Sequence, residues 1–329
     1  MGDWSLQSPS SPVDSEKFSP WPEFPGRKEG STMAVSKSSA DSQKASTTIR
    51  RATQADAEAS GKICFDAFGT LNARHGFPTD FPGPEAPIGL LTWMFSHPSF
   101  FCVVAERGGK IIGSNCLDER TPIAGVGPVT VDPGVQNGRV GRQLMDAVIA
   151  RSAERNVAGI RLVQTAFHNR SLALYAKLGF AIREPLACLE GPPLQKILPG
   201  YQVRPATPED VATCNDLCRR IHGHERGGEL ADGIAQGIAV VAERGGVIKA
   251  YGSGVGFFHH AVGEETSDLI ALISAAEEFA GPGFLVPMRN SELLRWCLGN
   301  GLRVRQMMTL MTMGLYNEPA GAYLPSVLY

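Results

Sequence analysis

A seven-residue segment occurs twice in this chain, letter for letter, first as Val103–Gly109 and again as Val240–Gly246. Two weaker echoes flank it in the same order, 50–56 with 204–210 and 174–180 with 296–302. Three echoes in one order indicate an internal repeat, so we expect the chain to fold as two copies of one unit. Its 329 residues suit two domains of ordinary size.

The spacing of the repeat suggests where the domains begin and end. We expect a first domain at 47–191, a turn-rich linker at 192–200 and a shorter second domain at 201–329. Residues 1–46 contain twelve Ser and five Pro with little hydrophobic periodicity, which predicts a disordered tail. The sequence does not decide whether the protein starts at Met1 or at Met33.

Hydrophobic periodicity in the first copy predicts alternating strands and helices. Thr53 is suited to cap a helix that runs to about Phe68, and Gly108-Gly109 is typical of a tight hairpin turn. Other expected elements are a long Pro/Gly/aromatic segment at 69–98, a strand at 127–131, a helix at 139–154, a strand at 160–167, a helix at 170–178 and a strand at 180–189. This order predicts a mixed α/β (α+β) fold with helices on a partly antiparallel sheet.

The bulk composition excludes several classes of protein. A net charge of −2 without a run of Lys or Arg gives no basis for binding nucleic acid. No apolar stretch is long enough to span a bilayer, and the N-terminus lacks the apolar core of a secretory signal. We therefore expect a cytoplasmic protein with no nucleic-acid or membrane partner, while an oligomer is compatible with these features.

The seven cysteines are scattered through apolar segments, which indicates reduced and buried thiols. Cys214, Cys218 and His222 fall at i, i+4 and i+8, a spacing that also suits metal ligands on one helix face. No second pair of ligands completes such a site. We therefore interpret the three as structural residues and expect no metal.

The stretch Val131–Met145 has the outline of a phosphate-binding loop. A strand-like run ends at Val131, and Gln136, Gly138 and Gly141 then precede a helix. Unpaired amides and the helix dipole favour phosphate at a helix N-terminus, and glycine lets the backbone approach closely. A Walker loop would need Gly-Lys-Ser/Thr, which is absent, and the spacing also departs from the Rossmann GxGxxG pattern.

Two motifs in the first copy resemble the GCN5-related N-acetyltransferase (GNAT) family. Val-Asp-Pro133 followed by Gln136 and Gly141 is similar to that family's Gln/Arg-x-x-Gly-x-Gly/Ala loop. Asn169–Phe180 is similar to its second motif, Asn…Ala…Leu-Tyr-x-x-x-Gly-Phe. The resemblance covers 48–191 well and 201–314 faintly. It implies the acyl-CoA N-acyltransferase fold in two tandem GNAT-like domains, of which the second is degenerate.

One position of the loop departs from the family pattern. Arg139 stands where the family has glycine, and Gly138 precedes it. A backbone amide does not need a missing Cβ when its residue has ordinary helical angles, so we expect Arg139 to adopt these angles in the first turn. Its guanidinium can also reach a phosphate.

The resemblance implies acetyl-CoA as the co-substrate. Its pyrophosphate would lie on the amides of 136–141 and its pantetheine arm would run along 127–131. The residues expected to bind it are Val129, Thr130, Val131, Gln136, Asn137, Gly138, Arg139, Val140, Gly141, Arg142 and Asn169. Asn169 also suits the N-cap of its helix, and both roles are compatible.

Members of this family transfer the acetyl group directly to an amine, without a covalent enzyme intermediate. Tyr175 matches the position of the acid that protonates the departing thiolate, and a core residue of its helix is the alternative interpretation. Asp118 and Glu119 are candidates for the base or for an anchor of the substrate amine, unless water serves instead. Glu106 belongs to the repeated segment, which favours a structural role for it.

The acceptor pocket is expected from the segment 69–98. Its candidate substrate contacts are His75, Phe77, Asp80 and Phe81. A self-packed lid core is the alternative interpretation of the same aromatic residues.

The second copy lacks the glycine loop. Gly263–Asp268, with three acidic residues, stands at the corresponding place, and acidic side chains would repel a pyrophosphate. Cys297 takes the place of Tyr175, so we expect no coenzyme binding there. The prediction is therefore an acetyl-CoA-dependent N-acetyltransferase that acts on a small-molecule amine. A tandem acetyltransferase of low-molecular-weight thiol biosynthesis and a non-catalytic acyl-CoA sensor are the alternatives, and the acceptor itself cannot be inferred.

Overall fold

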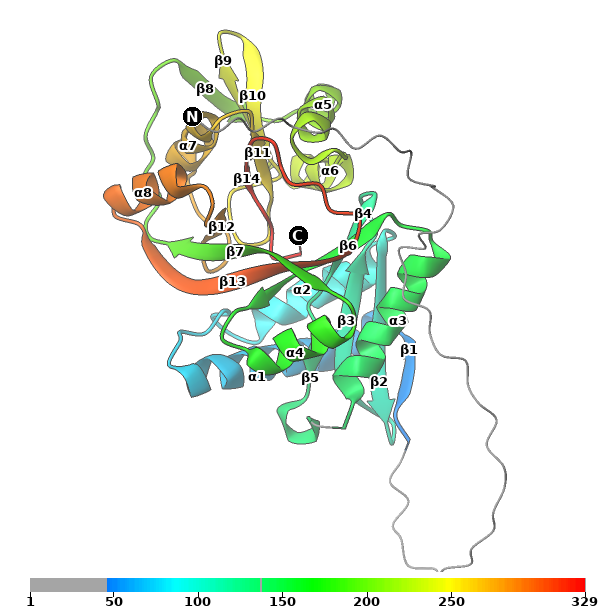
Figure 1. Cartoon of the computed structure of the whole chain (residues 1–329). Coiled ribbons are helices and arrows are strands. Elements are labelled where there is room, and N and C mark those ends of the chain that lie inside the picture. The colour runs from blue at the N-terminus through cyan, green and yellow to red at the C-terminus, as the bar shows by residue number, and fades with distance from the viewer. Residues whose placement is uncertain (1–45, 137, 329) are drawn as a thin grey trace, which may run out of the picture.

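The computed structural model of the chain describes residues 46–136 and 138–328. The predicted tail, apart from Ser46, and Asn137 and Tyr329 lie outside the described residues. The repeated order of elements is present, as a first half from β1 to β7 and a second half from β8 to β14 (Figure 1).

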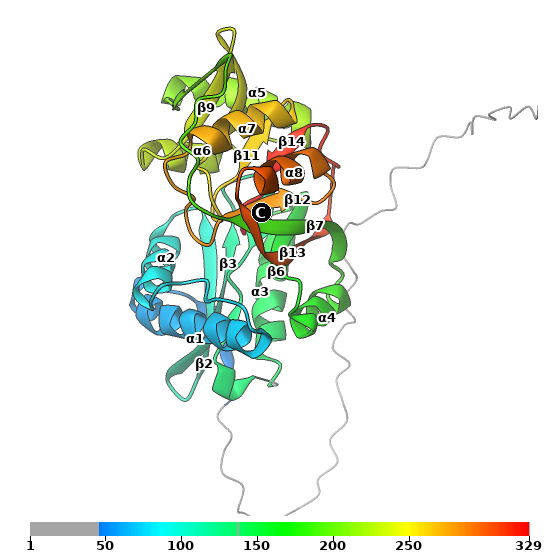
Figure 2. The same cartoon turned by 90° about the vertical axis from the view of Figure 1, so that its left-hand side faces the viewer.

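The first half alternates strands and helices. Its elements are β1 (Thr48–Arg51), α1 (Ala57–His75), α2 (Glu85–Ser96), β2 (Phe100–Arg107), β3 (Lys110–Asp118), β4 (Ile123–Val126), β5 (Thr130–Val131), α3 (Val140–Glu154), β6 (Gly159–Thr165), α4 (Asn169–Lys177) and β7 (Ala181–Glu190). Helices α1 and α2 cover one face of the sheet, and α3 and α4 cover the other (Figure 2). The mixed α/β class is therefore confirmed.

The second half repeats this order in a shorter form. Its elements are β8 (Tyr201–Pro205), α5 (Val211–His222), α6 (Gly227–Ala235), β9 (Val240–Arg244), β10 (Val247–Gly252), β11 (Ala261–Gly263), α7 (Thr266–Ala275), β12 (Phe284–Pro287), α8 (Ser291–Gly299), β13 (Arg303–Gly314) and β14 (Ala322–Leu324). By position in this order, α7 corresponds to α3 and α8 corresponds to α4.

Local sequence explains the first elements. Thr53 and Asp56 form the predicted cap, in which the Asp56 carboxylate accepts from the Thr53 amide at 2.8 Å. Gly108 and Gly109 have φ of 57° and 75°, as a two-residue hairpin turn requires, and few residues other than glycine adopt these angles readily. In α3, the apolar stripe of Val140, Leu144 and Val148 is buried against the sheet.

The Pro/Gly/aromatic segment 69–98 contains more helix than its composition suggests. It is largely helical, because α1 continues to His75 and α2 occupies 85–96. Gly69 does not break α1, since one glycine in a helix costs only about 1 kcal/mol. Pro84 and Pro87 lie at the N-cap and in the first turn of α2, where a missing amide hydrogen is tolerated.

The two halves exchange one strand each, β7 from the first and β13 from the second. β13 lies between β6 and β7 and pairs antiparallel with both, while β7 pairs on its other side with β12. The first half therefore closes its sheet with a strand from the second, and lends β7 in return. Figure 1 shows both long strands crossing the junction between the halves. A second sheet, in the order β14-β11-β10-β9-β8, belongs to the second half alone.

The chain after β14 returns to the junction. The Val327 amide donates to the carbonyl of Phe257 at 2.7 Å, and the Leu328 carbonyl packs so closely on Gly125 that a Cβ there would lie 2.1 Å away. All seven cysteines are buried and free, as predicted. Among the described helices, none combines the length and apolar character needed to cross a membrane.

Candidate active site

A cavity of about 670 Å³ opens where two strands of the first half separate. β4 pairs in parallel with β6 only at Ile123–Gly125, and β5 then pairs with β3 alone. The backbone from Val126 to Val131 consequently faces the cavity, without β6 beside it. A gap of this kind offers edge amides and carbonyls to an extended ligand.

The predicted phosphate loop forms one end of the cavity. Gln136, Arg139 and the first residues of α3, Val140 to Arg142, line it. The loop is held in place by the Gln136 amide group, which donates to the Val131 carbonyl at 3.3 Å and accepts from Arg170 at 3.2 Å. The N-terminal amides of α3 and the guanidinium groups nearby suit a pyrophosphate.

The prediction that Arg139 has helical backbone angles is wrong. The residue lies in the left-handed region, with φ of 61° and ψ of 8°, and serves as the N-cap of α3. This is the conformation that glycine adopts without strain, which explains why the family pattern has glycine here. In an arginine it costs roughly 1–2 kcal/mol.

Tyr175 lies on α4 at the cavity wall and is 8% exposed. Burial raises the pKa of its phenol to about 12, so the hydroxyl stays protonated at neutral pH. Asn169 also lines the cavity, but it is the first residue of α4 and His168 is the N-cap, which corrects the N-cap interpretation of Asn169.

The two candidate bases lie outside the cavity. Asp118 is buried against Arg120, whose Nε is 2.9 Å from its Oδ1, and burial raises the pKa of Asp118 while Arg120 opposes that shift. Glu119 accepts two hydrogen bonds from Arg151, at 2.8 and 3.1 Å. Neither carboxylate is among the cavity-lining residues, and both are held in ion pairs.

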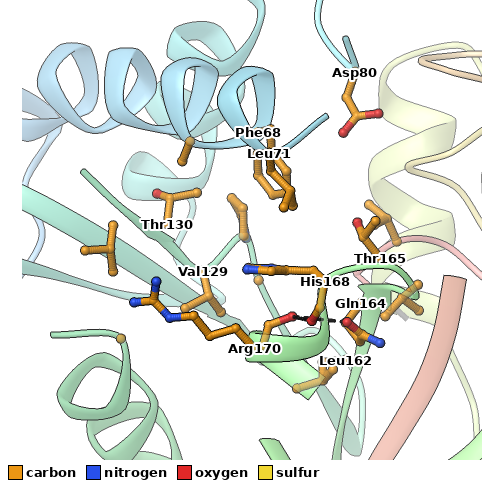
Figure 3. Close-up of a pocket in the computed structure, with 18 of the residues that line it drawn as sticks. Phe68, Leu71, Asp80, Val129, Thr130, Leu162, Gln164, Thr165, His168 and Arg170 are labelled. Atoms are coloured by element: carbon orange, nitrogen blue, oxygen red, sulfur yellow. Dashed lines mark hydrogen bonds between the residues drawn. The ribbon is translucent and has the colours of Figure 1, made fainter. Parts of the chain in front are cut away.

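Three of the four candidate substrate contacts line the cavity: His75, Asp80 and Phe81. Phe77 does not, and instead its ring stacks on Phe167 with centroids 4.2 Å apart. Burial raises the pKa of Asp80, although Asn72 and Arg305 act in the opposite direction. Figure 3 shows the Asp80 carboxylate pointing into the cavity, on the side of Thr165 and away from Val129.

Several lining residues were not predicted. Those of the first half include Phe68, Leu71, Gln164, Thr165, His168 and Arg170 (Figure 3), and those of the second half are Phe257, Phe258, Pro282, Met308, Val327 and Leu328. Burial lowers the pKa of His168, and Arg170 and His75 lower it further, so its imidazole is neutral at pH 7. Gln164 and Thr165 are polar residues at the end of a buried strand, just before a helix. This pattern is visible in the sequence, so both could have been predicted as candidate site residues. The second-half residues carry no such signal, because the strand exchange brings them here.

The corresponding helix terminus in the second half is occupied by its own side chains. Asp268 is fully buried in the first turn of α7 and accepts from the Glu265 amide at 2.8 Å and from the Tyr201 hydroxyl at 2.7 Å. A carboxylate therefore already neutralises the positive end of this helix dipole. Cys297, at the place of Tyr175, is fully buried in α8.

Residues 70–180 match the model of the acetyltransferase (GNAT) family. Among curated proteins, none matches the chain.

Three solved structures share the fold over most of the chain. A protein from Pyrococcus horikoshii described as an acetyltransferase has a TM-score of 0.66 at 18% identity, covering 85% of this chain and 93% of its own. A GCN5-related N-acetyltransferase from Sphaerobacter thermophilus has a TM-score of 0.56 at 15% identity, covering 83% and 96%. A tandem GNAT protein from the clavulanic acid biosynthesis pathway has a TM-score of 0.50 at 15% identity, covering 83% and 100%.

Proposed function

We propose that this protein transfers an acetyl group from acetyl-CoA to the amine of a small molecule, because residues 70–180 match the model of the acetyltransferase (GNAT) family. The family and the fold support acetyl transfer in general, and the proposal adds the kind of acceptor. One observation carries it: the phosphate loop, the strand gap and Tyr175 all line one cavity.

The residues present fit the coenzyme. The amides at the start of α3, together with Arg139, Arg142 and Arg170, would hold its phosphates. The strand edge from Val126 to Val131 would pair with its extended arm. When bound, the coenzyme supplies an activated acetyl group as a thioester.

Tyr175 would act as the acid. Its raised pKa keeps a proton on Oη at neutral pH, and that proton can pass to the sulfur as the carbon–sulfur bond breaks. The acceptor nitrogen has to be neutral when it attacks. The proton that it loses as the amide forms balances the proton that Tyr175 gives to the sulfur, and its return through solvent restores the phenol. The backbone amides around Val129 are suited to stabilise the oxygen on which negative charge develops.

The first test is coenzyme binding, measured by titration calorimetry with acetyl-CoA. Arg142→Ala removes one cation at the start of α3, and Arg155→Ala removes an exposed one at the other end of the same helix. We expect the first variant to weaken binding by about tenfold and the second to leave it unchanged. Equal effects of the two would contradict the placement of the phosphates.

The second test is turnover. Release of free thiol with a panel of amines supports the transferase, whereas tight binding of acetyl-CoA without turnover on any amine would support an acyl-CoA sensor instead.

A further inference from the structure

We infer that the acceptor carries a single ammonium group on an uncharged, largely apolar body, and that Asp80 receives this ammonium. This inference rests on the proposed function and narrows it to one class of amine. Its basis is the distribution of charge and of apolar side chains around the cavity.

Among the described residues that line the cavity, Asp80 is the one acidic side chain. The lining cations are Arg74, Arg139, Arg142 and Arg170, of which the last three belong to the phosphate loop and its surroundings. A cationic acceptor is therefore attracted to one place, and a second positive charge would meet arginines or apolar walls.

Burial raises the pKa of Asp80 and hydrogen bonding from Asn72 and Gln306 acts to lower it, but one oxygen of its carboxylate, Oδ1, lacks a close partner. Its side chain is 10% exposed, and Oδ1 is buried without a hydrogen bond in the described part of the chain. The cation within ion-pair range is Arg305, whose Nη2 lies 3.9 Å from that oxygen. A buried carboxylate oxygen without a close hydrogen bond is costly, so a ligand that supplies N–H donors to this carboxylate gains a charge-assisted bond.

Arg305 is already committed elsewhere. Its Nη1 donates to Glu190 at 2.8 Å, and its Nη2 donates to the carbonyls of Pro78 at 3.1 Å and Thr79 at 2.6 Å. It does not line the cavity. An α-amino acid would place a carboxylate beside the ammonium. The Arg305 Nε is buried without a hydrogen bond among the described residues, but Arg305 lies outside the cavity lining and does not present this donor to a ligand there. The geometry therefore disfavours zwitterionic acceptors.

The remaining acceptor wall is apolar and comes from both halves. Its larger side chains are Phe68, Leu71, Phe81, Leu90, Phe257 and Phe258. Such a surface stabilises a hydrocarbon or aromatic body by about 25 cal/mol per Å² buried. Gln164 adds one neutral polar side chain to the lining, and its Nε2 is buried without a hydrogen bond among the described residues.

A matched set of acceptors tests the inference with the full chain. 2-Phenylethylamine has the proposed chemistry, phenylalanine adds a carboxylate, spermidine adds further charges, and 2-phenylethanol removes the ammonium. We expect kcat/KM for 2-phenylethylamine to exceed that for phenylalanine and spermidine by at least about tenfold, and 2-phenylethanol to bind the coenzyme-loaded protein about 10- to 100-fold more weakly than the amine.

The variant Asp80→Asn should raise KM for 2-phenylethylamine by about 10- to 100-fold and leave the Kd of acetyl-CoA within about twofold. Asp66→Asn is the matched control, since Asp66 is an exposed carboxylate on α1 that does not line the cavity. Unchanged KM in Asp80→Asn overturns the inference. If that variant does not fold, equal binding of 2-phenylethylamine and 2-phenylethanol to the unaltered protein overturns it.

The two levels of the proposal fail in different ways. If acetyl-CoA does not bind, the proposed function fails and the inference falls with it. If acetyl-CoA binds and the acetyl group goes preferentially to spermidine or phenylalanine, the transferase stands and the inference about Asp80 is wrong.

Discussion

The two halves of the molecule keep the same ion-pair network and differ at one helix terminus. In each half, an arginine on the first strand bridges the capping aspartate and a glutamate on the neighbouring strand. The members are Arg50, Asp56 and Glu106 in the first half and Arg204, Asp210 and Glu243 in the second, with contacts of 2.7–2.8 Å. These groups organise the first strand and helix, so both halves need them whatever they bind.

The helix termini show where the halves diverge. The start of α3 faces a cavity with arginines around it, whereas the start of α7 is filled by the buried carboxylate of Asp268. Under the proposed function, one scaffold serves as a binding site in the first half and as a structural support in the second, and the charges at this helix end distinguish the two.

The largest expected effect comes from separating the halves. A fragment of residues 47–200 lacks β13, so β6 and β7 lose the strand that joins them. We expect it to be insoluble or unfolded by circular dichroism, and we expect co-expression with residues 201–329 to restore a soluble complex. A folded, soluble lone fragment would show that the exchanged strand is dispensable.

Tyr175→Phe should have the second-largest effect. Removing the acid should lower kcat by about 10²- to 10⁴-fold with little change in the Kd of acetyl-CoA. Cys297→Ala changes the corresponding helix of the second half and should leave kcat unchanged. Both are measured as thiol release with a saturating amine, and full activity of Tyr175→Phe would remove the acid assignment.

Asp268→Asn removes the buried charge at the start of α7, the helix terminus at which the second half differs from the first. The buried amide keeps one acceptor and loses the charge, so we expect the free energy of unfolding to fall by about 1–3 kcal/mol in urea titrations. The exposed Glu277→Gln is the control and should change it by less than about 0.5 kcal/mol. A gain of coenzyme binding sites beyond one per chain in Asp268→Asn would mean that this carboxylate alone prevents binding.

The shared network should give both halves the same dependence on pH. Hydrogen bonds from Arg50 and Arg204 lower the pKa of Asp56 and Asp210 to about 2 each. Since the folded pKa lies below the unfolded value of about 3.9, the stabilisation is complete above about pH 4 and is lost as the pH falls towards 2.

Asp56→Asn and Asp210→Asn test this symmetry. Each should lower the free energy of unfolding at pH 6 by about 2 kcal/mol and have little effect at pH 2. Urea titrations at the two pH values measure the difference. A pH-independent loss in one half alone would show that its network is not equivalent to the other.

The smallest effect is expected at Arg139. Arg139→Ala removes the guanidinium and keeps the strained left-handed backbone, whereas Arg139→Gly removes both. Both should weaken coenzyme binding several-fold, and the glycine variant should be more stable than the alanine variant by about 1 kcal/mol. Calorimetry and urea titration separate the two contributions, and equal stability would argue against backbone strain at this position.

Elements with strong local signals could be predicted from the sequence. The hairpin at Gly108-Gly109, the stripe on α3 and the place of Tyr175 on its helix all depend on residues close together in the chain. Three of the four predicted acceptor contacts reach the cavity for the same reason, since they belong to one short segment around α1.

Features that depend on distant residues could not be predicted. No local pattern specifies that β13 inserts between β6 and β7, and the second-half wall of the cavity follows from that exchange. Asp118 and Glu119 were candidate bases by position alone, but each lies within reach of an arginine that holds it away from the cavity. The angles of Arg139 oppose its residue type, so propensity could not reveal them.

The exchange of β7 and β13 also affects how the duplicated second copy is kept during evolution. After a duplication, a copy that binds nothing is ordinarily free to decay and to be deleted. Here the second copy contributes a strand to the sheet of the first and part of the wall of its cavity, so deleting it would damage the partner that retains the loop. Selection on the first copy thus extends to the second, and mutations there can change which acceptor fits without touching the chemistry.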